Sequence, residues 1–192
     1  MFYYDLFSAA IRLLSVILLV MNSPYNWVVA SFACMMSFYN FWCMQFYAKS
    51  MMHLAKIFVQ FYGWLKWQDL DKQHPHRTYR TSWHDFRKAY LYLFIIGLWL
   101  TYYLAPFGPY FMQKPQEILL IALNCLSLWL STHRKIENWY TWCFYNVINA
   151  YVYISHGFIA NGMVSICYLA LSLQGYLNWL EYLQPEVETS KI

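Results

Sequence analysis

The chain of 192 residues is 60% hydrophobic and 22% aromatic, and only 11% of its residues are charged. A soluble domain carries charge at roughly a quarter of its positions, so the composition predicts a membrane protein whose surface mostly faces lipid. The net charge of +4 is too small and too localised to indicate nucleic-acid binding. The five cysteines fall in apolar runs without paired spacing, which indicates neither a disulfide framework nor a zinc site.

Apolar runs of about 20 residues predict seven transmembrane helices in an all-α fold. The sequence Asn22-Ser23-Pro24 separates the first run from the second. The only sizeable predicted loop, residues 69–87, is polar and separates the first three helices from the rest, and residues 183–192 form an acidic tail. The predicted helices span residues 5–22, 25–47, 50–68, 88–107, 115–132, 137–156 and 160–182.

The lysines and arginines of the loops and helix ends are divided unequally between the two sides of the predicted bundle. With seven helices, nine of these cations share the side of the C-terminus and two lie opposite. Because positively charged loops face the cytoplasm, we expect the N-terminus outside and the C-terminus in the cytoplasm. The nine are Lys66, Lys72, Arg77, Arg80, Arg87, Lys88, Arg134, Lys135 and Lys191, and the two are Lys49 and Lys114.

The chain repeats itself at a spacing of 112 residues, which lays residues 26–67 over residues 138–179 without a gap. Both copies run through the membrane in the same direction. We therefore predict a first three-helix repeat (1–68), a linker helix (88–107) and a second three-helix repeat (115–182). Parallel repeats of this kind are typical of transporters that hold their substrate near the midplane between the repeats. The identical pairs are Asn26/Asn138, Trp27/Trp139, Phe32/Phe144, Tyr39/Tyr151, Phe46/Phe158, Ala48/Ala160, Met51/Met163, Gly63/Gly175, Leu65/Leu177 and Trp67/Trp179.

Four tryptophans, Trp27, Trp67, Trp139 and Trp179, occur in both copies at predicted cytoplasmic helix ends. Structural roles should be shared between the copies, whereas specialised roles need not be. We therefore interpret these tryptophans as an interfacial aromatic belt and as repeat packing rather than as ligand contacts.

Polar side chains that differ between the copies mark the third predicted helix as part of a candidate site. His53, Lys56, Gln60 and Trp64 follow one another at three- and four-residue steps, which places them on one face of a helix. Their counterparts in the second copy are Ser165, Tyr168, Ser172 and Tyr176.

The sixth predicted helix carries Trp142, Tyr145, Asn146 and Asn149 at helical spacing within an apolar run. Carboxamides in hydrocarbon cost free energy unless they meet a partner, a cavity or a ligand. Gln60 and Asn146 both fall near mid-span, so the two faces could meet at one depth. Amides flanked by aromatic rings suit an aromatic, hydrogen-bonding small molecule. Simple hydrogen bonding between helices is the alternative that stays open.

Other chemistry has less support in the sequence. His53 and His156 could form a bis-histidine haem or metal pair, but no carboxylate lies near either in sequence. No Ser/His/Asp or Cys/His catalytic set is visible, so we expect no enzymatic activity, no metal and no cofactor. Lys56 lies about two turns into its helix. Glu117 is a possible counter-ion for it, and Arg12 competes with Lys56 for that carboxylate. A charged Lys56 facing the site would disfavour a cationic substrate.

The second half contains HRKIENWYTWCFYNVINAYVY and LALSLQGYLNW, and the first half contains FYAKSMMHLAKIFVQFYGWLKW. These paired motifs resemble the signatures of the PnuC family of vitamin transporters. The resemblance implies a fold related to SWEET sugar transporters, assembled as a homotrimer in a bacterial inner membrane. It implies facilitated diffusion of an unphosphorylated B-vitamin precursor, with members for nicotinamide riboside, thiamine and riboflavin, drawn inward by a cytoplasmic kinase. The substrate positions that it carries over are Gln60, Trp64, Trp142 and Asn146.

This chain departs from the PnuC pattern at three positions, one just before the third predicted helix and two within it. Lys49 and His53 stand where family members often have an acidic residue and a glutamine, and Lys56 replaces an apolar or aromatic residue. Nicotinamide riboside and thiamine are both cations. The resemblance indicates nicotinamide riboside first, and these departures leave thiamine, riboflavin or a related nucleoside open.

Overall fold

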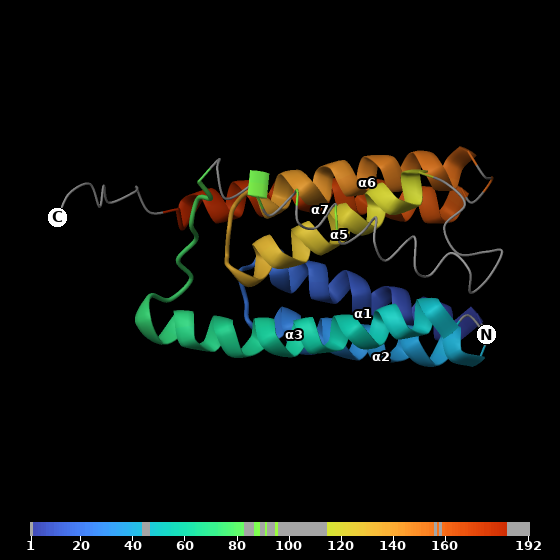
Figure 1. Cartoon of the computed structure of the whole chain (residues 1–192), viewed down its shortest axis with the longest axis horizontal. Helices are drawn as coiled ribbons and strands as arrows, with labels where there is room; N and C mark the ends of the chain where they lie inside the picture. Colours follow the sequence, from blue (N-terminus) through green and yellow to red (C-terminus); the bar gives the residue numbers. More distant parts are fainter. Residues whose placement is uncertain are drawn as a thin grey trace.

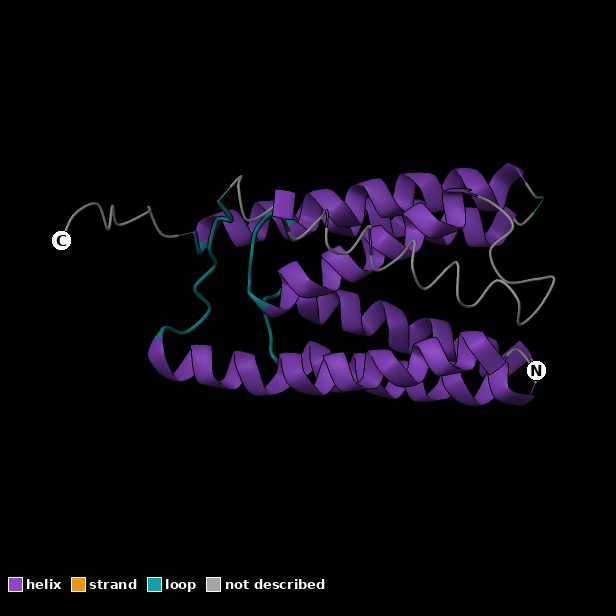
Figure 2. Ribbon diagram, in the orientation of Figure 1, coloured by secondary structure: helices purple, strands orange, loops and turns teal. Residues whose placement is uncertain are grey.

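The computed structural model describes residues 2–43, 47–82, 87, 88, 91, 95, 115–155, 157 and 159–183, and this part of the chain is helical with short connections (Figure 2). The predicted all-α class is confirmed. Among the helices described, none is both long and apolar enough to cross a membrane. The helices are α1 (Phe2–Val20), α2 (Tyr25–Cys43), α3 (Tyr47–Gln73), α5 (Pro115–Thr132), α6 (Asn138–Ser155) and α7 (Ile159–Glu181).

The described helices form two groups of three. Helices α1, α2 and α3 pack together, and so do α5, α6 and α7. The two groups lie side by side along their length in Figure 1, and they meet where α1 contacts α7 and where α3 contacts α5. Each half of the chain therefore builds one side of the bundle, and any space between the groups is lined from both halves.

Helix α3 is longer than predicted. It continues to Gln73, so the prediction of a loop from residue 69 is wrong for the first five loop residues. The last turn is polar, but its side chains have partners: Lys72 Nζ lies 3.3 Å from Asp69 Oδ1, and Asp71 accepts a hydrogen bond of 3.1 Å from the backbone N–H of His76. Helix α5 has the predicted bounds. Most of the predicted helix 88–107 and the tail after residue 183 lie outside the described residues.

The segment after α3 joins the two groups at the loop end of the bundle. The Thr78 hydroxyl donates to the carbonyl of Trp179 at 2.9 Å, and the backbone N–H of Tyr79 donates to the carbonyl of Arg134 at 3.0 Å. Thr78 is fully buried. A chain segment from the first group thus completes the hydrogen bonding of two turns in the second group.

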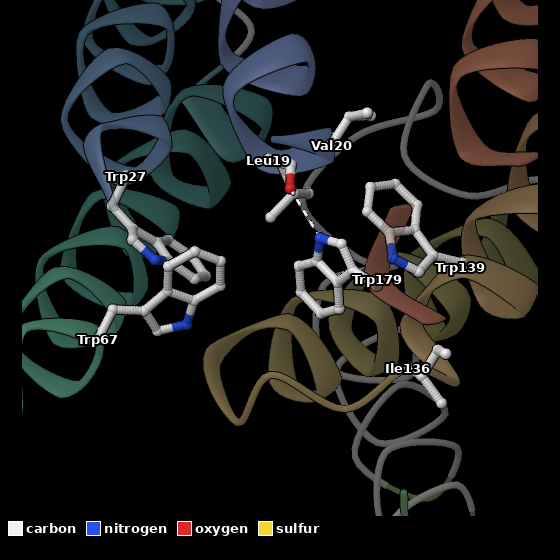
Figure 3. Packing of buried hydrophobic residues seen from close by; sticks show 7 residues of the cluster. All are labelled: Leu19, Val20, Trp27, Trp67, Ile136, Trp139 and Trp179. Carbon is white, nitrogen blue, oxygen red and sulfur yellow. Dashed lines mark hydrogen bonds between the residues drawn. The ribbon is translucent and has the colours of Figure 1, made fainter. Parts of the chain in front are cut away.

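Four tryptophans form the centre of the core where the groups meet (Figure 3). The rings of Trp27 and Trp67 are T-shaped at 5.5 Å, and those of Trp139 and Trp179 are T-shaped at 5.3 Å. Trp67 and Trp179 then meet across the two groups at 5.9 Å. Each ring is at most 1% exposed. The belt part of the interpretation is therefore wrong, because belt residues face the membrane surface, whereas these rings fill the junction between the groups. The packing role that the same interpretation gave them agrees with their burial in the core.

Two glycines make room for this core. A Cβ atom on Gly63 would lie 2.7 Å from the ring of Trp27, and a Cβ atom on Gly175 would overlap the ring of Trp139. Real side chains do not approach this closely, so the rings occupy the space that a larger residue would need. The two glycines are 112 positions apart in the chain, and so are the two tryptophans that they contact.

The N–H groups of Trp67 and Trp179 form hydrogen bonds between the two groups. Trp67 Nε1 donates to the carbonyl of Ser131 at 3.0 Å, and Trp179 Nε1 donates to the carbonyl of Leu19 at 3.1 Å; the second bond is drawn in Figure 3. Ser131 and Leu19 lie in the last turns of α5 and α1. Each carbonyl also accepts a backbone N–H from the turn that ends its helix, from Arg134 at 3.0 Å and from Asn22 at 2.9 Å. The indoles therefore add a second hydrogen bond at the ends of both helices.

Candidate functional site

A cavity of about 240 Å³ lies between the two groups, and its walls come from all six helices described above. Gln60 of α3 and Asn146 of α6 line it from opposite groups, and their side chains are 6% and 4% exposed. The polar faces of the third and sixth predicted helices therefore open onto the same space. Six of the predicted site residues line this cavity: His53, Lys56, Gln60, Trp142, Tyr145 and Asn146.

The two remaining predicted residues have other contacts. Neither Trp64 nor Asn149 is among the described residues that line the cavity. The ring of Trp64 packs on Tyr25 at 5.7 Å, and Asn149 Nδ2 donates to the Ser165 hydroxyl at 3.0 Å. The second contact is a hydrogen bond between α6 and α7 of the kind that joins helices without a ligand.

The cavity wall holds buried polar atoms that have no hydrogen-bond partner within the described part of the chain. These atoms are Gln60 Oε1, which can accept a hydrogen bond, and Trp142 Nε1, which can donate one. The third is His53 Nδ1, which can do either, depending on the tautomer. Leaving a buried polar group unpaired costs about 1–3 kcal/mol. All three residues line the cavity, so a bound polar molecule could satisfy atoms that the fold leaves unsatisfied.

Aromatic rings give the cavity flat apolar surfaces. Trp142 and Tyr145 meet in a T-shaped contact at 5.6 Å. On the opposite side, the His53 ring stacks on Phe41 at 5.4 Å with an interplanar angle of 15°. Fixed rings next to amides suit recognition of a planar heterocycle that carries hydrogen-bonding substituents.

The sequence reasoning missed the part of the cavity wall that α5 and α7 provide. Asn124, Tyr168 and Ser172 line the cavity as well, and Ser172 lies 3.5 Å from Asn146 Nδ2. The signal that could have found them is the 112-residue spacing: Asn124 pairs with Arg12, Tyr168 with Lys56 and Ser172 with Gln60. In each of these pairs, both members line the cavity.

The possible haem pair and the possible counter-ion of Lys56 each include a residue outside the part of the chain that the structure describes. His156 and the side chain of Glu117 lie outside the described residues. Within the described part, no group of three His, Cys, Asp or Glu residues is arranged to hold a metal ion. Two cations, Arg12 and Lys56, line the cavity, and the described lining includes no carboxylate.

A buried ion pair lies at the loop end of the bundle. Arg134 is fully buried, its Nη1 lies 2.6 Å from Asp71 Oδ1, and its guanidinium lies 4.3 Å from the ring centre of Trp67. Burial by itself raises the pKa of Asp71, but hydrogen bonds from Arg134 and the His76 backbone, together with the arginine charge, hold it below its usual value. This pair links α3 to the turn before α6.

Two three-helix groups with a cavity between them are an arrangement found in solute transporters. The chain belongs to the nicotinamide mononucleotide transporter family, whose pattern matches residues 3–181. The resemblance to the PnuC family read from the sequence is therefore confirmed.

The fold is also that of a solved relative. The crystal structure of the vitamin B3 transporter PnuC matches this chain with a TM-score of 0.64 and 17% sequence identity. The match covers 91% of this chain and 79% of the other. No curated protein matches the sequence. At this identity the likeness concerns the fold, so the substrate must be argued from the residues of the cavity.

Proposed function

We propose that this protein is a passive importer of a B-vitamin precursor of the nicotinamide riboside type, and that the cavity between the two groups is its substrate site. The observation that carries this proposal is the convergence of Gln60, Trp142 and Asn146 on one cavity, where Gln60 Oε1 and Trp142 Nε1 have no hydrogen-bond partner among the described residues. The carboxamides would hydrogen-bond the polar edges of the ligand, and the Trp142 ring would pack on its heterocycle.

The size of the cavity supports a small ligand. Sites for drug-sized molecules have volumes of roughly 300–1,000 Å³, and this cavity measures about 240 Å³. A single heterocycle with one sugar suits this space better than a dinucleotide. Tyr145 and His53 would complete its wall. The hydrogen bond of Asn149 to Ser165 and the packing of Trp64 on Tyr25 favour a structural role for those two residues.

The outer surface supports a location in a membrane. Large apolar side chains are exposed on both groups, including Phe58 at 69%, Phe144 at 66% and Leu177 at 62%. An apolar exterior of this extent needs lipid or protein cover. We place the N-terminus outside and the C-terminus in the cytoplasm of a bacterial inner membrane, as the distribution of lysine and arginine favours.

The paired contacts support two parallel repeats that flank the substrate. Trp27 with Gly63 and Trp139 with Gly175 are equivalent contacts at a spacing of 112 residues. We propose that the groups rock against each other around the tryptophan core to open the cavity to either side, as in other repeat transporters. The homotrimer and the trapping of imported vitamin by a cytoplasmic kinase rest on the family resemblance.

Uptake into proteoliposomes tests the proposal. Labelled nicotinamide riboside should enter until the inside and outside concentrations are equal, and collapse of proton and sodium gradients should leave the rate unchanged. Enclosed kinase and ATP should raise accumulation above that level. Thiamine and riboflavin in parallel would reveal the alternative vitamins. Uphill uptake that depends on an ion gradient would contradict the passive mechanism, and uptake of none of these compounds would contradict the substrate class.

A further inference from the structure

The charges of the cavity wall are distributed unevenly between the two groups. Arg12 on α1 and Lys56 on α3 both belong to the first group, and both line the cavity. Their counterparts at a spacing of 112 residues are Asn124 and Tyr168, which line the facing side and are neutral. The cavity therefore has a cationic wall opposite a neutral, hydrogen-bonding wall.

The cations lack an acidic partner in the part of the chain that the structure describes. The described lining contains no aspartate or glutamate, and no ion pair joins Arg12 or Lys56 to another described residue. A positive charge in a mostly apolar cavity is costly unless an anion compensates it. The wall thus favours occupants that bring negative charge with them.

A third polar group strengthens this wall. Gln60 lies one helical turn beyond Lys56 on α3 and is 6% exposed. Its Oε1 has no hydrogen-bond partner in the part of the chain that the structure describes. The amide of Gln60 can orient a ligand beside the Lys56 ammonium, while Trp142 on α6 offers its ring and its free N–H from the facing wall.

We propose, building on the function assigned to this cavity, that its ligand carries an anionic group held by Lys56 and Arg12 and an aromatic ring held against Trp142. For a pyridine vitamin, the anion is a ring carboxylate in place of the carboxamide, or a phosphate on the sugar. The cavity thereby binds the acidic analogues of nicotinamide riboside more tightly than the purely cationic nicotinamide riboside itself. Lys56 and Arg12 are the residues that determine this specificity.

Matched ligand pairs test the proposal on the purified full-length protein in detergent, by calorimetry. The pairs are nicotinamide with nicotinate and nicotinamide riboside with nicotinate riboside, and nicotinamide mononucleotide adds the phosphate. We expect at least one anionic member to bind about tenfold tighter than its uncharged or cationic match, the ratio that an added charge-assisted hydrogen bond supplies. Preference for the carboxylate or for the phosphate identifies which anion is recognised.

Charge-removing variants locate the effect. Lys56→Met and Arg12→Gln should each reduce the preference for the anionic ligand over its amide match about tenfold. Lys66→Met, on the same helix but away from the cavity lining, is the matched control and should preserve the preference. Because the wild-type comparison needs no variant, the proposal is testable even if one variant fails to fold.

Two outcomes overturn the inference, and they are distinguishable from failure of the proposed function. Equal or tighter binding of the amide forms by the wild type contradicts the anionic subsite and leaves the vitamin transporter intact. A preference for anions that survives in both variants contradicts the role of Lys56 and Arg12. Binding of none of the pyridine compounds contradicts the proposed function, and the inference falls with it.

Discussion

Asp71 and Arg134, 63 positions apart in the chain, form a contact of 2.6 Å that joins the end of α3 to the turn between α5 and α6. Arg134 adopts a positive φ of 49° and is fully buried, with its guanidinium over Trp67. An arginine without Asp71 would leave an uncompensated charge in the interior. The ion pair therefore holds the loop end of one group against the other.

Loss of the Asp71 carboxylate should destabilise the protein in a pH-dependent way. The pKa of Asp71 is lowered below its ordinary value of 3.8, so its contribution is complete above that value and is lost as the pH falls through the lowered pKa. Asp71→Asn should reduce the free energy of unfolding by about 1.5–3 kcal/mol at pH 7. Thermal unfolding in detergent between pH 7 and pH 3 should show this difference shrinking in acid.

Asp69→Asn is the matched control for this measurement. Its pair with Lys72 has side chains that are 73% and 76% exposed, and exposed pairs contribute little. We expect no resolvable change in stability at either end of the pH range. A loss of stability for Asp71→Asn that is equal at pH 7 and pH 3 would show that charge pairing is not the cause.

The two glycines at the tryptophan core should tolerate no side chain. Gly63→Ala and Gly175→Ala would drive a methyl group into the rings of Trp27 and Trp139, and overpacking of this kind costs about 1–3 kcal/mol. Leu65→Ala and Leu177→Ala, on exposed faces of the same helices at 46% and 62% exposure, are the controls. Melting temperatures that fall only in the controls would refute this account of the core.

The two reciprocal indole hydrogen bonds should contribute unequally. Replacing either Trp67 or Trp179 with phenylalanine removes an N–H that donates to the opposite group, at a cost of about 1 kcal/mol. Trp67→Phe should lose more, because the smaller ring also weakens the contact with the buried Arg134 guanidinium. The order of the two unfolding free energies, measured by denaturant titration in micelles, checks this, and the reverse order speaks against it.

Asn149 should matter for stability and not for the ligand. Its amide bonds the Ser165 hydroxyl at 3.0 Å, and interhelical hydrogen bonds in membranes average about 0.6 kcal/mol. A double-mutant cycle with Asn149→Ala and Ser165→Ala should give a coupling energy of about this size. Ligand affinity should stay at the wild-type value in both single variants. A tenfold weaker affinity for Asn149→Ala alone would instead return this residue to the site.

Much of the candidate site could be predicted because the repeat separates shared residues from specialised ones. Gln60 and Asn146 differ from their counterparts, and the cavity brings them together. The same comparison misjudged Tyr168 and Ser172, since a tyrosine and a serine look ordinary in sequence even when they line the wall. Periodicity also located the helices closely, and α5 has the predicted bounds.

The remaining features depend on contacts between distant parts of the chain. A tryptophan at a helix end looks the same in sequence whether it faces lipid headgroups or another helix group, so the burial of Trp67 and Trp179 was not predictable. Arg134 lies in a polar turn, so its sequence predicts an exposed side chain, yet it is fully buried and pairs with Asp71. The extension of α3 to Gln73 has the same origin, because the partner that fixes its last turn comes from the second half.

Substrate binding in the cavity between the groups is the central feature of the proposed transporter. The direct measurement is the affinity of purified Gln60→Ala and Asn146→Ala for the vitamin ligand that binds the wild type, with the exposed Gln68→Ala on the same helix as Gln60 as the control. Each cavity variant should lose about 1 kcal/mol or more of binding free energy, at least a fivefold rise in Kd, while Gln68→Ala binds normally. Unchanged affinity in both cavity variants, with the proteins folded, would contradict the assignment.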